Sequence, residues 1–249
     1  MNRYAVMGSP IQHSHSPTLH LAAFDFLGLS AEYAAVEKTA IDRIDLADYK
    51  GLSLTMPLKN DAFNIADSHD EESEVTGVCN TLLISEERAL GLNTDVYGIA
   101  KSVEQVPKET VEIIGNGATA KSAAYALRES KISFTGRNAE RVRDITLWAE
   151  SLGITVQDSE DVDLVIDTTP AAARTHYKPH RVVLDVAYNS DRNKNSESLI
   201  SGLEMLLHQA VLQSVVFNEG KIDSKIDREQ LTSVMREALQ TRVGEWSHA

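Results

Sequence analysis

The chain has 249 residues, of which 42% are hydrophobic and 24% charged, and its formal net charge is −13 at pH 7. These proportions are ordinary for a globular protein, and the length suffices for one large domain or two modest ones. The strong negative charge argues against nucleic acid or an anionic membrane as the main partner. The sequence has no run of 18 apolar residues that would predict a transmembrane helix, and residues 1–6 do not resemble a signal peptide.

Cys79 is the single cysteine, so an internal disulfide is excluded. A chain without disulfides fits a reducing compartment, and we therefore expect a cytoplasmic protein. The simplest interpretation of Cys79 itself is a small, buried apolar residue.

The first hundred residues alternate strand and helix signals, which predicts an α/β domain. In chain order we expect a strand at 3–8, a helix from Ser16 to about Gly28 with Pro17 at its first position, and a strand at 31–37. A short amphipathic helix at 39–49, a strand at 51–55 and a helix after Pro57 should follow. Residues 78–84 and 89–92 are expected to form a hairpin with its turn at 85–88. The acidic run at 67–74 could hold a metal, but a solvated helix end or loop is the better interpretation.

Residues 111–124 read as a strand, a tight glycine turn and an alanine-rich helix. Gly115 would allow the turn, Gly117 would let backbone N–H groups approach a pyrophosphate, and Ala120 would let the helix pack close to the strand. Such a G-x-G-x-x-A pattern also fits any tight strand-to-helix turn. A second strand at 131–135 lies at the right distance for a βαβ unit, which favours a dinucleotide site.

The end of that second strand carries no acid, although NAD-binding units usually place Asp or Glu there. It carries Arg137, with Asn138 beside it and Arg141 one turn later. A guanidinium can clamp a 2′-phosphate, so the pattern predicts a preference for NADP. The alternative is two solvated arginines at the start of a helix.

The glycine turn opens a second α/β segment. Its strands are expected near 111–114, 131–135, 154–156, 163–167 and 182–186, its helices near 118–129 and 139–152, and a polar loop at 188–198. Two further helices, near 203–217 and 228–244, are expected to close back onto the first domain. We thus predict a substrate domain at 1–98, completed by about 203–249, and a Rossmann-like domain at 99–202.

Several residues could carry chemistry. Ser14 and Ser16 stand just before a predicted helix, where their hydroxyls could bind a carboxylate, although Ser16 could equally be only a helix cap. A metal site at the nearby histidines is discounted, because no cysteine or carboxylate completes a ligand set. Lys59 follows a strand end and Asp95 a hairpin, yet a solvated lysine and a helix-capping aspartate explain them equally well in isolation.

Together these stretches resemble the shikimate dehydrogenase family over nearly the whole chain. The opening signature G-x-P-x-x-H-S-x-S-P-x-x-H is matched by Gly8, Pro10, His13, Ser14, Ser16, Pro17 and His20; T-x-P-x-K by Thr55, Pro57 and Lys59; Gly-x-x-Asn-Thr by Gly77, Asn80 and Thr81; and Asn-Thr-Asp by Asn93, Thr94 and Asp95. The glycine turn, the Arg137 element, Thr168-Thr169-Pro170, 185–188 and 202–210 follow in the family's order.

The resemblance implies a role for each matched position. Lys59 and Asp95 would be the catalytic pair. Substrate would be bound by Ser14, Ser16, Thr55, Asn80, Tyr188 and Gln209, with Ser14, Ser16 and Tyr188 at its carboxylate. NADP(H) would be bound by Gly115, Asn116, Gly117, Ala118, Thr119, Ala120, Arg137, Asn138, Arg141, Thr168, Val186 and Gly202. No metal is implied.

This sequence departs from the family's pattern at five positions. They are Ser53 in place of Asn, Val96 in place of Gly, Ala118 in place of a second loop glycine, Gly136 in place of Asn, and Asn138 in place of Thr. The last four bear on cofactor affinity and preference, and none touches the expected catalytic pair.

The resemblance further implies two α/β domains with an active cleft between them, and an oxidoreductase that interconverts 3-dehydroshikimate and shikimate with NADP(H) in aromatic amino acid and chorismate biosynthesis. The partners would be small molecules, and the protein a monomer or homodimer. A quinate/shikimate dehydrogenase of relaxed substrate or cofactor choice and a non-catalytic nucleotide-sensing homologue are the alternatives.

Overall fold

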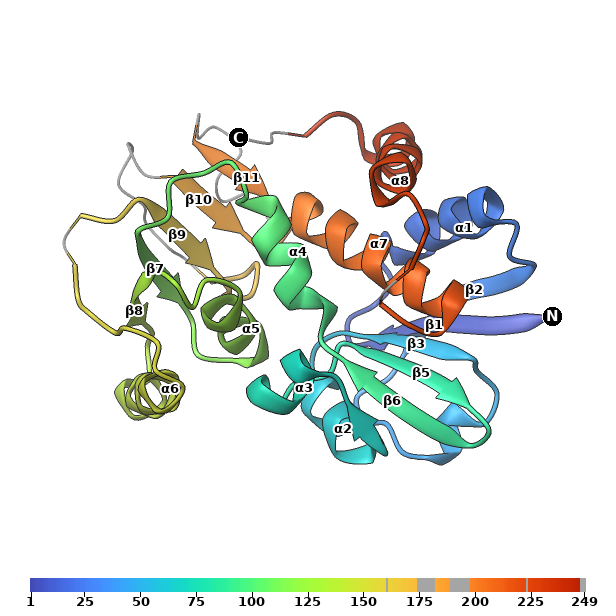
Figure 1. Cartoon of the computed structure of the whole chain (residues 1–249), viewed down its shortest axis with the longest axis horizontal. Helices are drawn as coiled ribbons and strands as arrows, with labels where there is room; N and C mark the ends of the chain where they lie inside the picture. Colours follow the sequence, from blue (N-terminus) through green and yellow to red (C-terminus); the bar gives the residue numbers. More distant parts are fainter. Residues whose placement is uncertain (160, 174–181, 189–197, 223, 247–249) are drawn as a thin grey trace. The chain divides into compact units, whose positions relative to one another are not determined.

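The computed structural model describes residues 1–159, 161–173, 182–188, 198–222 and 224–246 (Figure 1). The chain forms two compact units: Met1–Tyr97 with Leu206–Glu245, and Gly98–Met205 with Trp246–Ala249. It leaves the first unit within helix α4 (Thr94–Ser102) and returns to it within helix α7 (Gly202–Glu219). Neither these helices nor any other in the described ranges is long and apolar enough to cross a membrane.

The first unit is built on a six-stranded sheet in the order β2-β1-β3-β5-β6-β4. Its strands are β1 (Asn2–Gly8), β2 (Ala31–Glu37), β3 (Gly51–Leu54), β4 (Ser68–His69), β5 (Thr81–Ser85) and β6 (Arg88–Leu92). Strand β1 pairs in parallel with β2 and β3, and β5 pairs antiparallel with both β3 and β6. Because side chains alternate along a strand, β1 offers apolar residues to both faces of the sheet.

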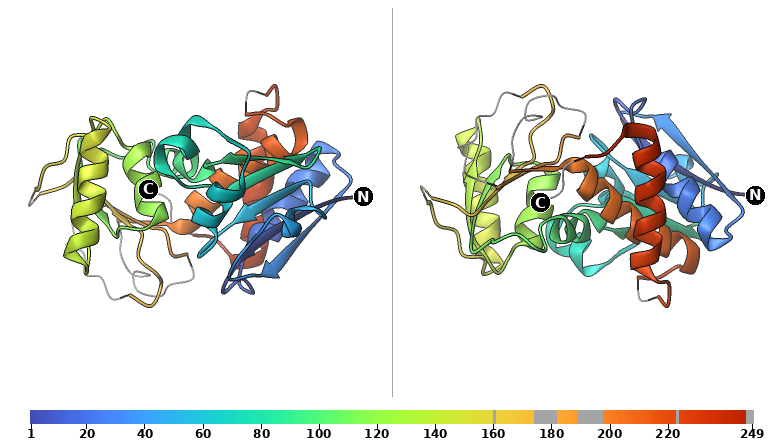
Figure 2. Two further views of the ribbon diagram at one scale, coloured as in Figure 1. Left: turned by 90° about the horizontal axis from the view of Figure 1, so that it is seen from below. Right: turned by 90° about the horizontal axis from the view of Figure 1, so that it is seen from above.

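Helices cover both faces of this sheet. They are α1 (Ser16–Leu27), α2 (Lys59–Ile65), α3 (Glu71–Thr76) and α8 (Arg228–Val243), with the part of α7 from Leu206 onward. Tyr4 and Val6 of β1 pack with Phe24 of α1 and Phe217 of α7, whereas Met7 packs on the opposite side with residues that include Ala62 of α2. Helix α8 lies beside α1 (Figure 2).

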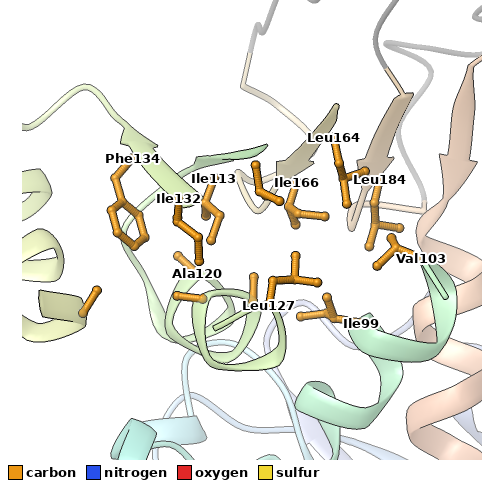
Figure 3. Packing of buried hydrophobic residues seen from close by; sticks show 14 of the residues in the cluster. Ile99, Val103, Ile113, Ala120, Leu127, Ile132, Phe134, Leu164, Ile166 and Leu184 are labelled. Carbon is orange, nitrogen blue, oxygen red and sulfur yellow. The ribbon is translucent and has the colours of Figure 1, made fainter. Parts of the chain in front are cut away.

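The second unit holds a five-stranded sheet in the order β11-β10-β9-β7-β8, in which every pairing is parallel. Its elements are β7 (Thr110–Ile114), α5 (Ala118–Ala126), β8 (Lys131–Thr135), α6 (Ala139–Ser151), β9 (Leu164–Asp167), β10 (Val182–Asp185) and β11 (Leu199–Ser201). Ile113, Ile166 and Leu184 of the strands pack towards Ala120 of α5 and Ile99 of α4 (Figure 3). This Rossmann-like arrangement and the separate N-terminal sheet confirm the predicted α/β fold class.

The predicted helix at 39–49 is wrong. Only a 3₁₀ turn at Ile44–Leu46 forms there. The Asp42 carboxylate accepts the backbone N–H groups of Ile44 and Asp45, at 2.8 and 3.2 Å. Side-chain oxygens that bind the backbone in this way compete with helix formation.

Other boundaries differ in smaller ways. The expected strand at 154–156 is reduced to one bridge between Val156 and Ile132. Strands β4 and β11 and helix α4 were not predicted, and the acidic run supplies Asp70 as the N-cap of α3. Residues 189–197 of the expected polar loop lie outside the described residues. Cys79 is fully buried, as expected, and its burial raises the pKa of its thiol to about 12.

Candidate functional site

The first unit contains a sheltered ion pair between Lys59 and Asp95. Lys59 Nζ is 2.5 Å from Asp95 Oδ2, and the two side chains are only 14% and 5% exposed. Charges sheltered to this degree interact more strongly than a surface pair does. The interpretation of Lys59 as a solvated surface lysine is therefore wrong.

Short loops at the ends of strands bring the two residues together. Strand β3 ends at Leu54, a turn follows in which Leu58 N–H donates to Thr55 O at 2.8 Å, and Lys59 opens α2. Asp95 is the second residue of α4, just beyond β6, so it lies inside the helix and is not its cap. The carboxylate stands in the first turn, where the helix dipole favours a negative charge.

Asn80 ties this pair to α7. Its Nδ2 donates to Asp95 Oδ1 at 2.7 Å and to Gln209 Oε1 at 3.4 Å. The amide of Gln209 in turn donates to Leu206 O at 2.8 Å within the helix. Four of the predicted site residues, Lys59, Asn80, Asp95 and Gln209, thus form one connected cluster.

The cluster leaves Asp95 with a donor on each oxygen, Lys59 on Oδ2 and Asn80 on Oδ1. An ammonium held in this way can donate a proton to a substrate oxygen, and the resulting amine can take one back. The arrangement therefore fits acid–base chemistry at a carbonyl or hydroxyl group.

The loop that carries Ser14 begins beside the loop that carries Thr55. Thr55 N–H donates to Met7 O, and Ser9 N–H donates to Met56 O, both at 2.9 Å. A Cβ atom at Gly8 would lie 2.3 Å from Thr55 Cγ2, so glycine is needed for this close approach.

Ser14 and Ser16 lie at the start of α1. The Ser14 hydroxyl accepts the N–H of Ser16 at 3.3 Å. Ser16 is the first helical residue, and His15 occupies the N-cap position without a side-chain bond to the helix. The interpretation of Ser16 as a helix cap is therefore wrong. Since the Ser16 N–H already donates to Ser14 and Pro17 has no N–H, this end of α1 would meet an anion mainly through the two serine hydroxyls.

Thr81 and Thr94 also belong to this cluster, although the Asn-Thr pairs that contain them would fit simple turns equally well. The hydroxyls of Thr81 and Thr94 donate to Asn80 Oδ1, at 2.8 and 3.1 Å. The repetition of the Asn-Thr pair in the sequence is what points to these two threonines. Gln213 also joins the cluster, through Thr81 at 2.8 Å, and no motif pointed to it.

In the second unit the predicted cofactor residues gather at one edge of the parallel sheet. Each of the five strands is followed at its carboxyl end by one such residue or segment: Gly115–Ala120 after β7, Arg137–Arg141 after β8, Thr168 after β9, Val186 after β10 and Gly202 after β11. In open α/β sheets this edge is where ligands bind. Tyr188 follows two residues after Val186, beyond the end of β10.

The glycine turn has the geometry that a pyrophosphate needs. Gly115 has φ +120°, and a Cβ there would lie 2.2 Å from Thr168 Oγ1, so only glycine fits. Gly117 is the N-cap of α5, makes no side-chain bond to the helix, and has no atom within 4 Å of the place of a Cβ. No side chain at position 117 covers this helix end, which is the kind of end that binds anions.

The segment after β8 presents two exposed arginines. Asn138 caps α6 by accepting Arg141 N–H at 3.0 Å, which fixes the backbone between them. Across the described part of the chain, neither Arg137 nor Arg141 forms a salt bridge. Their charges are available to a phosphate ligand.

Comparison with known proteins shows which families and structures this chain resembles. Residues 6–82 match the family described as Shikimate dehydrogenase substrate binding domain. The shikimate dehydrogenase (NADP(+)) of Methanothrix thermoacetophila is 29% identical over an alignment of 277 residues, which covers 98% of each chain. The structure of Mycobacterium tuberculosis shikimate dehydrogenase matches with a TM-score of 0.79 at 27% identity, over 95% of this chain and 99% of that one. For shikimate 5-dehydrogenase from Thermus thermophilus, in complex with NADP(H) and shikimate, the TM-score is 0.77 at 26% identity, over 96% and 100% of the two chains.

Proposed function

Because the chain belongs to the shikimate dehydrogenase family, we propose that it catalyses the reversible NADPH-dependent reduction of 3-dehydroshikimate to shikimate. The observation that carries this proposal is the sheltered Lys59–Asp95 pair, since it supplies the proton chemistry that the reduction of a ketone requires. The first unit would bind the substrate and the second the cofactor.

On the substrate, Lys59 would donate a proton to the oxygen of the 3-keto group as the alcohol forms, and would accept it in the reverse direction. Asp95 would hold the Lys59 ammonium in place, because its carboxylate lies 2.5 Å from Nζ. Positioned proton transfer of this kind contributes roughly 10²–10⁴-fold to a rate.

The remaining residues of the first unit would orient the ring. Ser14 and Ser16, at the start of α1, offer hydroxyls that suit the substrate carboxylate. The resemblance implies a carboxylate role for Tyr188 as well, which belongs to the second unit. Thr55, Asn80 and Gln209 would meet the hydroxyl groups.

NADPH, when bound, supplies the hydride. The N–H groups at the start of α5 would hold its pyrophosphate, and Arg137 would contact the 2′-phosphate. Thr168 would act by supporting the turn, because its hydroxyl donates to Ile114 O at 2.9 Å and packs against Gly115.

The test is a spectrophotometric assay at the NADPH absorbance band, with shikimate or quinate offered against NADP or NAD. We expect turnover of shikimate with NADP to exceed the other three combinations in kcat/KM. Equal turnover of quinate would move the assignment to a quinate/shikimate dehydrogenase. Nucleotide binding without any turnover would identify a non-catalytic homologue and reject the proposal.

We also expect the enzyme to work as a monomer or homodimer in the cytoplasm, in the aromatic biosynthetic pathway. The buried single cysteine supports a reducing compartment. Gel filtration and cell fractionation test the two statements.

A further inference from the structure

A chain of buried polar side chains is connected to Asp95 through Asn80. Its members are Thr81, Gln213, Ser53, Tyr33 and His20, and each is at most 6% exposed. Polar groups cost free energy when they are buried unless they are hydrogen-bonded, so the bonds that satisfy them show how they are arranged.

The amide of Gln213 has one possible orientation in this chain. Its Oε1 lies 2.8 Å from Ser53 Oγ and 3.1 Å from His20 Nε2. Burial lowers the pKa of His20 to about 3, so the ring is neutral, and its Nε2 carries the proton because an amide oxygen can only accept. The other end of the amide faces Thr81 Oγ1 at 2.8 Å and the backbone carbonyl Asn80 O at 3.3 Å. A backbone carbonyl can only accept a hydrogen bond, so this end is the Nε2 group, and the amide is oriented without reference to His20.

This orientation sets the direction of the next two bonds. Thr81 accepts from Gln213, and its own hydroxyl therefore donates to Asn80 Oδ1 at 2.8 Å. Thr94 N–H donates to the same oxygen at 2.9 Å. With its oxygen occupied by donors, the Asn80 amide presents Nδ2 to Asp95 Oδ1, at 2.7 Å.

We propose that Gln213 is a positioning residue for the reaction. Through Thr81 it fixes the orientation of the Asn80 amide, and the Asn80 amide in turn holds the Asp95 carboxylate against Lys59. The role rests on the proposed function of the Lys59–Asp95 pair. Without Gln213 the Thr81 hydroxyl could turn towards Thr94 Oγ1, which lies 3.3 Å away, and Asn80 would lose one of the bonds that orient it.

The test compares kcat and KM for shikimate oxidation in the unaltered protein and in Gln213→Leu. This substitution keeps a similar side-chain volume and removes the amide. We expect kcat to fall about tenfold while the KM for NADP stays within about twofold, since the cofactor segments belong to the other unit. If Gln213→Leu does not fold, Thr81→Val interrupts the same chain with a side chain of similar shape, and the same result is expected.

Two controls separate positioning from a general effect on packing. Tyr33→Phe removes a buried hydroxyl from the far end of the chain but leaves Ser53 free to donate to Gln213, so kcat should stay within about twofold. In an Asn80→Ala background, Gln213→Leu should have no further effect on kcat, because Gln213 acts through Asn80.

Each result has a definite meaning. The positioning role would be overturned if kcat in Gln213→Leu is unchanged. It would also be overturned if the fold-decreases in kcat of Gln213→Leu and Asn80→Ala multiply in the double variant. Either result would leave the proposed function intact. If the unaltered protein turns over no shikimate, both the proposed function and this role are overturned.

Discussion

At the scale of single residues, the site depends on two charges that are distant in sequence. Lys59 and Asp95 are 36 positions apart, yet their charged atoms lie 2.5 Å from each other on sheltered side chains. Removing one partner of a sheltered pair leaves the other charge uncompensated. Both residues are therefore sensitive positions for activity, and variants of either need a check of folding.

Lys59→Ala should lower kcat by roughly 100-fold or more, because the proposed proton donor is lost while the proposed cofactor segments are unchanged. Steady-state assays give kcat, and a fluorescence titration with NADPH checks that nucleotide binding persists. Lys50→Ala, which alters an exposed lysine just before β3, is the matched control and should retain activity. A Lys59→Ala enzyme with near-normal kcat would remove Lys59 from the mechanism.

His20 should make the stability of the protein depend on pH. Burial lowers its pKa from the ordinary value of 6.5 to about 3, so near pH 5 the unfolded chain binds a proton that the folded chain does not bind. The stabilising contribution is present above pH 6.5 and is lost as the pH falls towards 3. Urea unfolding midpoints measured between pH 7 and pH 5 should therefore decline more steeply in the unaltered protein than in His20→Gln. Parallel declines would show that His20 is not the titrating group.

At the scale of elements, we expect the turn from β8 to α6 to determine the preference for NADP over NAD. Asn138 caps α6, and this places the exposed Arg137 just before the helix start, where a phosphate would satisfy both the helix end and the guanidinium. The absence of an acidic side chain from residues 136–139 removes the group that would repel a 2′-phosphate.

Arg137→Ala should raise the KM for NADP roughly tenfold or more and leave the KM for NAD nearly unchanged, because only NADP carries the 2′-phosphate. Both cofactors are assayed with saturating shikimate. Arg143→Ala removes an exposed arginine elsewhere on α6 and serves as the control. An equal effect of Arg137→Ala on NAD and NADP would mean that Arg137 supports the adenine or the fold instead.

The elements show what the sequence can and cannot predict. Strands β1, β2 and β7 and helix α6 follow from apolar periodicity and clear breakers, and their predicted bounds lie close to the observed ones. The helix expected at 39–49 failed because Asp42 binds the backbone, a contact that periodicity does not show. Strand β11 has only three residues and takes its stability from its neighbour β10.

The same distinction applies to the site. Lys59 and Asp95 carry a motif and were predicted, whereas Gln213 lies one helical turn after Gln209 on α7 with no motif of its own. Its importance becomes visible only when the fold brings it to Thr81, 132 positions away in the sequence.

At the scale of the whole molecule, the first unit is made of two separate pieces of chain. Helix α8 belongs to the second piece and packs on α1 of the first, and it buries Leu231, Met235 and Leu239. These contacts join the N-terminal sheet to the C-terminal helices, so the unit depends on residues from both ends of the sequence.

Leu239→Ala should lower the free energy of unfolding by about 2–5 kcal/mol, since it leaves a cavity at a fully buried position on α8. Val243→Ala alters the partly exposed last residue of the same helix and should cost much less. Urea unfolding followed by circular dichroism measures both variants. Equal, small losses would show that α8 contributes little to the stability of the first unit.

Because the first unit is made of two separate stretches of chain, the two units can fold only in a certain order during translation. Residues 98–205, which make up almost all of the Rossmann-like unit, leave the ribosome before Gln209, Gln213 and α8 have been synthesised. Since domains fold as units while the chain emerges, the sheet of the second unit can form before the first unit has its C-terminal helices. A nascent chain would therefore acquire the segments proposed to hold the cofactor before Asn80 has its partners on α7.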